Sequence, residues 1–278
     1  MSRRRLSLAA TVLGIGLVCT LLPGTSRASI TINPGWDLLE TLAGGATTFL
    51  GQNFQGVPLS SYNFGGSIGM KSVGTTDTIV QRLASASVPI GPPVTVPIEM
   101  LALQLMSVNP FDPDGPGGAP LATYFVTLQS QRSLSEGGPG TMTLGTIDIS
   151  NTGEAATHGT FDSFFDVFFD LRAGALNGPI VNSSNLGLNS SGNGWGHNAP
   201  SGALEIEDVN YLLNGFNTDN DFWPLSAISE SHPSGAMHTV QSAIPVPFGF
   251  SPGAGLLICS GLFGLTQLRR KLALGARM

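Results

Sequence analysis

One short motif matches the sequence pattern around a catalytic serine. Residues 65–69 (GGSIG) fit G-x-S-x-G, the turn that presents a nucleophilic serine hydroxyl in many hydrolases. That turn needs a strand before it and a helix after it, and residues 70–74 (MKSVG) are a poor start for a helix. In a chain with 37 glycines the pattern also arises easily by chance. We therefore predict no catalytic residues, and expect Ser67 to be an ordinary loop serine.

The other candidates for acid–base or metal chemistry are isolated histidines and carboxylates. None of the histidines has zinc-ligand spacing from a cysteine or lies in an H-E-x-x-H motif, so no metal site is predicted. Glu205 and Glu207 would share one face of an extended segment, as a glycosidase pair could, but they also suit an acidic surface. We expect His158 and His197 to be solvated in glycine-rich loops. The four histidines are His158, His197, His232 and His238.

Two short runs of oxygen-bearing residues could bind calcium. The first alternates Asn, Asp and Asp as an EF-hand loop does, but Phe222 and Ile228 stand where that loop needs Gly and Glu. The second precedes Gly115 and also departs from the pattern. Asx-turns explain both runs, so calcium stays an open alternative and no cofactor is predicted. The runs are Asn217, Asp219 and Asp221, and Asp112 and Asp114.

A carbohydrate-binding surface usually presents an exposed aromatic side chain. Trp195 lies in the glycine-rich segment 192–197 (GNGWGH) and is the tryptophan most suited to such a role. The alternative is that Trp195 covers the core beneath a loop, since tryptophan is on average highly buried. The sequence leaves both interpretations open.

The composition limits what can position these residues. The chain has 278 residues with 37 Gly and 19 Pro, and only 11% of them are charged where about 25% is ordinary. Because 41% are hydrophobic, a charge-driven disordered chain is excluded. Frequent Gly and Pro exclude a coiled coil or a helical bundle. All 18 acidic residues lie between Asp37 and Glu230, with few basic residues among them, which excludes nucleic-acid binding.

Alternating apolar and polar residues predict several β-strands. In residues 161–171 the odd positions are almost wholly apolar, and three aspartates at even positions would repel one another on a helix. We expect one all-β domain, β-sandwich-like, with a jelly roll or a barrel as alternatives. The other predicted strands are 76–83, 94–108, 122–129 and 141–149, with a last short strand in 230–246. Helices are predicted at 34–43 and 204–213, and loops at 91–93, 109–120 and 182–200.

The first 28 residues have the order of a secretory signal peptide. Arginines at positions 3–5 precede an apolar stretch, and small residues lead to a predicted cleavage site between Ala28 and Ser29. The prediction implies export and processing by signal peptidase. A retained membrane anchor is the alternative, and a loose twin-arginine pattern leaves the export route open.

The other end of the chain has the pattern of a transmembrane helix. Residues 248–268 carry no charge, and at about 1.5 Å per residue they are long enough to cross the hydrocarbon core. The tail 269–278 begins with a basic cluster, which the positive-inside rule places in the cytoplasm. We therefore expect the β-rich domain 29–240 and the linker 241–247 to lie outside the membrane.

This C-terminal segment resembles a PEP-CTERM sorting signal, in which a short motif, one span and a basic tail follow one another. It is most similar to the variant that reads Pro-Phe-Glu-Phe-Ser-Pro, with Gly249 in place of Glu. The resemblance implies bacterial export, recognition by the membrane transpeptidase exosortase, and delivery to the cell surface or the exopolysaccharide matrix. The residues that carry it are Pro245, Pro247, Phe248, Phe250, Ser251, Pro252, Arg269, Arg270 and Lys271.

Three functional hypotheses follow. The first is a non-enzymatic exported protein of the cell surface or matrix. Its partners are exosortase, signal peptidase, exopolysaccharide and, through the span, the membrane. The second is a carbohydrate- or calcium-binding adhesion module. The third is a secreted hydrolase that uses Ser67.

Overall fold

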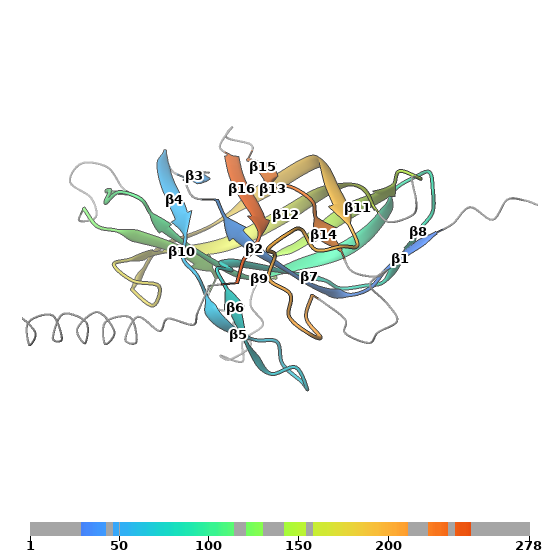
Figure 1. The fold of residues 1–278 in the computed structure, drawn as a ribbon. Helices are drawn as coiled ribbons and strands as arrows, with labels where there is room; N and C mark the ends of the chain where they lie inside the picture. Colours follow the sequence, from blue (N-terminus) through green and yellow to red (C-terminus); the bar gives the residue numbers. More distant parts are fainter. Residues whose placement is uncertain are drawn as a thin grey trace, which may run out of the picture.

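In the computed structural model, every regular element of the described residues is a β-strand (Figure 1). The described residues are 29–42, 47–49, 51–113, 121–129, 142–153, 158–210, 222–232 and 237–245. Within them no helix is long and apolar enough to cross a bilayer. The predicted all-β class is therefore confirmed for the part of the chain that the structure describes.

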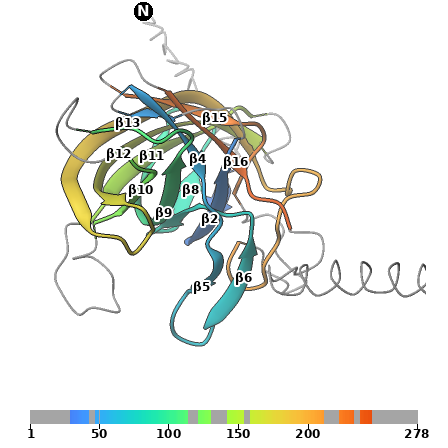
Figure 2. The ribbon, with the colours of Figure 1, turned by 90° about the vertical axis from the view of Figure 1, so that its left-hand side faces the viewer.

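The main sheet in these ranges closes on itself as an eight-stranded antiparallel barrel (Figures 1 and 2). Around the barrel the order is β9, β7, β2, β16, β15, β13, β12 and β11, and β11 pairs back to β9. The barrel alternative thus describes the fold better than the sandwich. The bounds are β2 (Gly35–Thr41), β7 (Thr78–Arg82), β9 (Val94–Ser107), β11 (Leu144–Asn151), β12 (His158–Ala173), β13 (Ile180–Gly196), β15 (Ile228–Ser231) and β16 (Met237–Ser242).

Shorter strands extend this barrel. β10 (Tyr124–Leu128) pairs with both β9 and β12, which extend past the end of β11. β3 (Thr47–Phe49) pairs with β4 (Gln52–Gly56), which joins the end of β9. β1 (Ile30–Ile32) pairs with β8 (Ala86–Val88), and the two-residue β14 (Trp223–Pro224) pairs with β13. The hairpin of β5 (Ser60–Asn63) and β6 (Met70–Gly74) projects from the barrel (Figures 1 and 2).

The core has two parts. The larger cluster lies inside the barrel and includes Phe161, Phe165 and Trp195. A smaller cluster lies on the other face of β2 and β7, where Leu38 and Ile79 pack with side chains from the β5–β6 hairpin and the 204–209 segment. These strands are thus covered on both faces, which explains why their apolar residues run together instead of alternating.

The predicted strands agree well with the structure. Segments 76–83, 94–108 and 122–129 contain β7, β9 and β10, and 94–108 is one long strand. Segment 141–149 covers most of β11, which runs on to Asn151. β12 covers 161–171, and its odd positions Phe161, Phe165, Val167, Phe169 and Leu171 are buried as predicted. β16 ends at Ser242, two residues into the predicted linker 241–247.

The predicted helix at 34–43 is wrong. Residues 35–41 form β2, which pairs with β7 on one side and β16 on the other. Burial on both faces removed the alternation that marks a strand, so its apolar spacing also fitted a helix. The described residues of the second predicted helix, 204–210, form a turn in which the Asn210 side chain accepts from Ile206 N–H and donates to the Leu204 carbonyl, both at 2.8 Å.

The predicted loop at 182–200 is also wrong. Most of it belongs to β13, which pairs with β12 from Ile180 to Gly196. Serine, asparagine and glycine are poor strand formers, but β12 supplies a long apolar partner whose backbone groups fix the register. The side chains of 180–185 are exposed to solvent, so the polar ones among them are not desolvated when the strand forms.

Candidate functional site

The G-x-S-x-G motif lies in the turn of the β5–β6 hairpin. Ser67 is exposed, and the glycines at 65, 66 and 69 all have positive φ, as a tight turn needs. The turn leads into strand β6, and no helix follows. The strand-to-helix elbow that would activate Ser67 is therefore not built.

Trp195 is a core residue. The interpretation as an exposed sugar-binding aromatic is therefore wrong, and the alternative, that Trp195 packs on the core, is confirmed. Its side chain is fully buried and its Nε1–H donates to the Ser150 carbonyl at 3.1 Å. It stacks on Phe222 with ring centroids 5.4 Å apart and meets the buried His197 edge-on. The expectation of a solvated His197 is thus also wrong. His158, the other histidine expected in a loop, is half-buried at the start of β12.

The carboxylate candidates do not assemble into a catalytic or metal centre in the described ranges. Glu205 and Glu207 are both exposed and flank the buried Ile206, as an acidic surface segment would. No group of three or more His, Cys, Asp or Glu residues placed to hold a metal occurs among the residues described. Asp114, Asn217, Asp219 and Asp221 lie outside the described residues.

The predicted processing signals flank the described barrel. Ser29 and Pro245 are its first and last described residues, and both are exposed. Ala28 and the rest of the sorting motif, the span 248–268 and the tail 269–278 lie outside the described residues.

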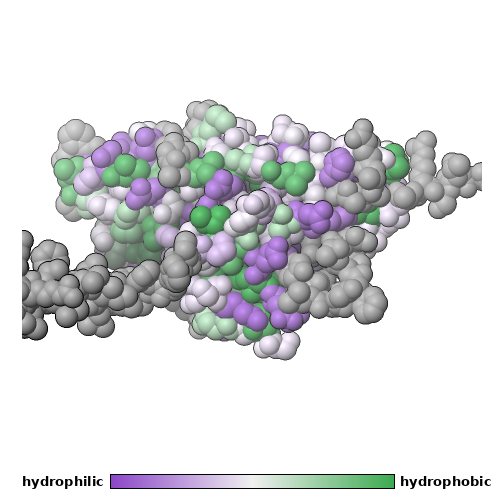
Figure 3. Space-filling model, viewed as in Figure 1, coloured by the Kyte–Doolittle hydropathy of each residue, from purple (hydrophilic) through white to green (hydrophobic). Residues whose placement is uncertain are grey.

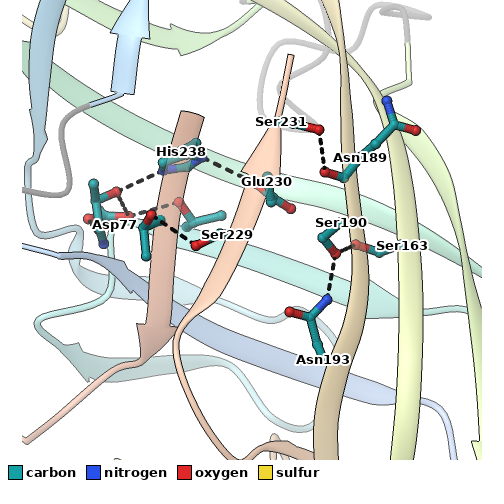
Figure 4. Close-up of polar contacts among 12 residues, drawn as sticks. Asp77, Ser163, Asn189, Ser190, Asn193, Ser229, Glu230, Ser231 and His238 are labelled. Atoms are coloured by element: carbon teal, nitrogen blue, oxygen red, sulfur yellow. Dashed lines mark hydrogen bonds and ion pairs between the residues drawn. The ribbon is translucent and has the colours of Figure 1, made fainter. Parts of the chain in front are cut away.

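A chain of buried polar side chains crosses four neighbouring strands (Figure 4). Nδ1 of His238 on β16 is 3.3 Å from Oε2 of Glu230, its direct partner on β15. Nε2 of His238 is 3.2 Å from Oγ1 of Thr41 on β2. The Thr41 hydroxyl in turn donates to Oδ1 of Asp77 at 3.2 Å. Because the Thr41 hydroxyl has one proton and donates it to Asp77, its oxygen accepts a hydrogen bond from His238 Nε2–H.

Asp77 anchors this chain beside β7. Its Oδ2 accepts from the Thr41 N–H at 2.7 Å and its Oδ1 from the Thr78 hydroxyl at 2.8 Å. Burial raises the pKa of Asp77, and these hydrogen bonds and the charge of His238 oppose that rise. Carboxylate, imidazole and hydroxyl follow one another as in a hydrolase triad. However, the Thr41 hydroxyl is buried and points at Asp77, and β4 covers it at Gly56, where a Cβ would overlap Asp77 Oδ2. We therefore interpret this row of buried polar side chains as a structural link between four strands.

A second buried pair joins β2 to β7. The Arg82 guanidinium contacts the Asp37 carboxylate, lies 5.1 Å above the Phe222 ring, and its Nε donates to the Asn33 carbonyl at 3.3 Å. Burial raises the pKa of Asp37, and the Arg82 charge opposes that rise.

His232 is buried close to this network, and its Nε2 has no hydrogen-bond partner among the described residues. Burial and the charge of His238 lower its pKa, while Glu230 acts in the other direction. Below about pH 6.5 the unfolded chain binds a proton at His232 before the folded chain does, so stability falls as pH falls.

We expect His232→Leu to raise the free energy of unfolding by about 1 kcal/mol at pH 7.5, since it removes an orphaned buried nitrogen beside apolar side chains. It should also weaken the loss of stability between pH 6.5 and pH 5. Urea unfolding across this pH range measures both effects. His238→Leu is the matched control and should have the opposite sign, because it leaves Glu230 buried without its imidazole partner. Equal losses in both variants would contradict this account.

The barrel interior has little room for a ligand. The interior cavity lined by Asp37, Met100, Phe165 and Glu230, among others, has a volume of about 40 Å³. The one that His232 and His238 line measures about 30 Å³. Each is close to the volume of a single water molecule, about 30 Å³ in the liquid.

A polar groove of about 410 Å³ lies on the outer wall of the barrel. We call it the outer groove. It lies where β13 and β15 separate, since those strands pair only at Asn189 and Ser231. Its walls come from β11, β12, β13 and β15 (Figure 4 shows several of the polar members). The lining residues are Thr146, Asp148, Asp162, Ser163, Phe164, Asn189, Ser190, Ser191, Ser229 and Ser231.

Strand register aligns part of this lining in one row. Thr146 is opposite Phe164, Phe164 is opposite Asn189, and Asn189 is opposite Ser231. All four are exposed, and directly opposite side chains point to the same face of a sheet. The row therefore crosses four strands with an aromatic ring between hydroxyl and amide groups.

A bulge in β13 shapes the neighbouring part of the groove. Between Ser190 and Asn193, β13 has one residue more than β12 has opposite it, and Gly192 N–H donates there to Asp162 Oδ1 at 2.7 Å. The hydroxyls of Ser163 and Ser190 lie 2.7 Å apart, and Asn193 donates to Ser190 at 2.9 Å (Figure 4). These contacts hold the floor rigid, while the outward side chains stay open to solvent.

Two aspartates face each other at one end of the outer groove. Asp148 on β11 is directly opposite Asp162 on β12, and the Thr95 hydroxyl donates to Asp148 at 2.5 Å. Like charges in such a pair repel by up to about 1 kcal/mol. No lysine or arginine lines the groove, so its potential is negative.

Sequence reasoning missed this groove altogether. A partial signal was available, since exposed even positions of 161–171 include Asp162 and Phe164, and 189–191 (NSS) carries three polar residues. What brings them together is long-range pairing, which local periodicity does not report. No protein-family model, no curated protein and no solved structure matches this chain.

Proposed function

We propose that this protein is an exported bacterial protein of the cell surface or exopolysaccharide matrix, in which the barrel has a non-enzymatic role. One observation carries the proposal: the described barrel occupies the interval between the two processing signals. β1 begins at Ile30, immediately after the predicted cleavage site, and β16 ends at Ser242, before the predicted sorting motif that begins at Pro245. Both cuts would leave every described strand intact.

The character of the barrel supports this proposal. Cys19 and Cys259 both lie within the two predicted signals, so the barrel needs no disulfide for its stability. The apolar side chains that it exposes are interspersed with hydrophilic ones on the face in Figure 3, as suits a surface in water. Signal peptidase and exosortase would act at the two ends, and the membrane would hold the chain through 248–268 until processing.

We expect deletion of residues 248–278 to release the protein from its producing cells into the medium, whereas the full chain stays at the surface or in the matrix. Fractionation followed by immunoblotting with an antibody against the barrel measures the distribution. The matched control replaces 248–278 with an unrelated single span and basic tail, and this chain should remain in the inner membrane. If both altered chains distribute as the full chain does, the C-terminal segment is not a sorting signal and the proposal is wrong.

The outer groove favours one further function within this proposal, the binding of carbohydrate. A matrix-associated protein can be retained by direct contact with polysaccharide as well as by its anchor. The groove is polar, open and lies on the outside of the barrel, where a polymer has access.

A further inference from the structure

The outer groove has the hydrogen-bonding character that hydroxyl-rich ligands require. Five serines, one threonine, one asparagine and two aspartates supply both donors and acceptors. The exposed Asn189 amide makes no side-chain hydrogen bond to the described part of the chain, so its two donors and its acceptor can face a ligand. At about 410 Å³ the groove also falls within the usual range for small-molecule sites, about 300–1,000 Å³.

An aromatic ring stands in the middle of this polar lining. Phe164 is 45% exposed, although a phenylalanine on the outer face of a barrel gains nothing from water. Its Cε2 lies 3.7 Å from the position that a Cβ would take at Gly187, an ordinary contact distance, so the ring lies close to this residue of β13. The electron-rich face of such a ring attracts the partly positive C–H groups of a sugar.

The row across the strands gives the groove a direction. Thr146, Phe164, Asn189 and Ser231 follow one another at the spacing of neighbouring strands, about 4.8 Å. A ligand lying along this row would stack on Phe164 and bond to hydroxyl or amide groups on both sides. This arrangement suits an internal segment of a polymer better than a single small molecule.

The charge of the groove selects among polymers. Asp148 and Asp162 face each other, and no basic side chain lines the groove. A uronic-acid or phosphate-bearing chain would be repelled by both carboxylates. A neutral sugar chain would instead donate its hydroxyl protons to them.

We propose that the outer groove binds a segment of neutral polysaccharide, with Phe164 as the stacking platform and Asn189 as the central hydrogen-bonding group. The proposal rests on the proposed function in one respect only, that the exported barrel meets such polymers outside the cell. Binding itself depends on the groove and not on sorting.

The test is calorimetric titration of the purified full-length chain, in a detergent without a sugar headgroup. The neutral probes are cellohexaose and mannohexaose, and the anionic probe is hexagalacturonic acid. We expect a neutral hexasaccharide to bind, and the anionic one to bind more weakly. Phe164→Ala and Asn189→Ala should each weaken the neutral complex about tenfold, the value of one lost contact of about 1.4 kcal/mol. Phe164→Tyr should retain binding.

Matched controls separate the groove from the rest of the surface. Met70→Ala and Asn53→Ala remove an exposed apolar and an exposed amide side chain from β6 and β4, away from the groove, and should leave affinity unchanged. Tighter binding of the anionic probe, equal losses in the control variants, or no binding of either neutral probe would overturn the proposal. Loss of binding with EDTA would also overturn it, because the sugar would then bind through calcium at Asp148 and Asp162. Since sorting is not needed in this assay, a failure here leaves the export proposal standing.

Discussion

Asp77→Ala is expected to lower the free energy of unfolding by about 3–5 kcal/mol, the usual range for breaking a buried charged network. The substitution leaves the Thr41 N–H and the Thr41 and Thr78 hydroxyls without their acceptor in the barrel wall. The effect extends to His238, whose bond to Thr41 depends on the Thr41 proton being used elsewhere. Urea unfolding at pH 7.5, followed by tryptophan fluorescence, measures the loss.

A second substitution separates the charge of Asp77 from its shape. Asp77→Asn keeps one acceptor and should cost less than Asp77→Ala. Burial raises the pKa of Asp77, so the folded chain binds a proton there before the unfolded chain does, and stability should rise as pH falls through the folded pKa towards the ordinary value of 3.8. Asp77→Asn should abolish that part of the pH dependence. If Asp77→Ala changed the free energy of unfolding by less than about 0.5 kcal/mol, as a surface substitution does, the buried polar side chains from Glu230 to Asp77 would not hold the strands together.

Trp195→Ala should lower the free energy of unfolding by a similar amount, about 3–5 kcal/mol, because it removes a large buried aromatic side chain. The cavity would lie between Phe222 and His197, and the Ser150 carbonyl would lose its donor. Differential scanning calorimetry of the variant and the parent measures the change in Tm. Trp195→Phe keeps most of the apolar area and should recover part of the loss.

A matched substitution tests whether this effect belongs to the core. Met70 is 64% exposed on the projecting hairpin, and Met70→Ala should change stability by less than about 0.5 kcal/mol. An equally small effect at Trp195 would favour the original alternative, in which that tryptophan is a surface residue.

The fold was predictable where one face of a strand meets the core and the other meets water. β12 shows this best, since its buried odd positions follow directly from the alternation of phenylalanine and aspartate. The prediction failed at β2, because the smaller core covers its second face and hides the alternation. It failed at β13 because pairing with β12 outweighs the weak strand propensity of Ser, Asn and Gly.

Closure of the barrel and the outer groove depend on contacts between distant residues. β11 returns to β9, and Asn189 meets Ser231 across 42 positions of sequence. Local patterns contain no information about such pairs. The same reason explains Trp195, whose glycine-rich neighbours suggested a loop although β12 and the Ser150 carbonyl hold it in the core. Glu230 and His238 likewise become partners only through the β15–β16 register.

The processing signals stay predictions from the sequence, and each depends on local order alone. An apolar stretch, a cleavage site and a basic cluster are consecutive features, which need no tertiary contact to be recognised. The described strands lie between those predicted signals, from Ile30 at the start of β1 to Ser242 at the end of β16.

The intact mass of the protein from fractionated producing cells tests the central claim most directly. The account predicts a species outside the inner membrane that lacks residues 1–28 and the residues beyond the sorting motif that begins at Pro245. A species that retains 248–278 and stays in the inner membrane would contradict sorting and cleavage. One that also retains residues 1–28 would contradict export by a cleaved signal peptide.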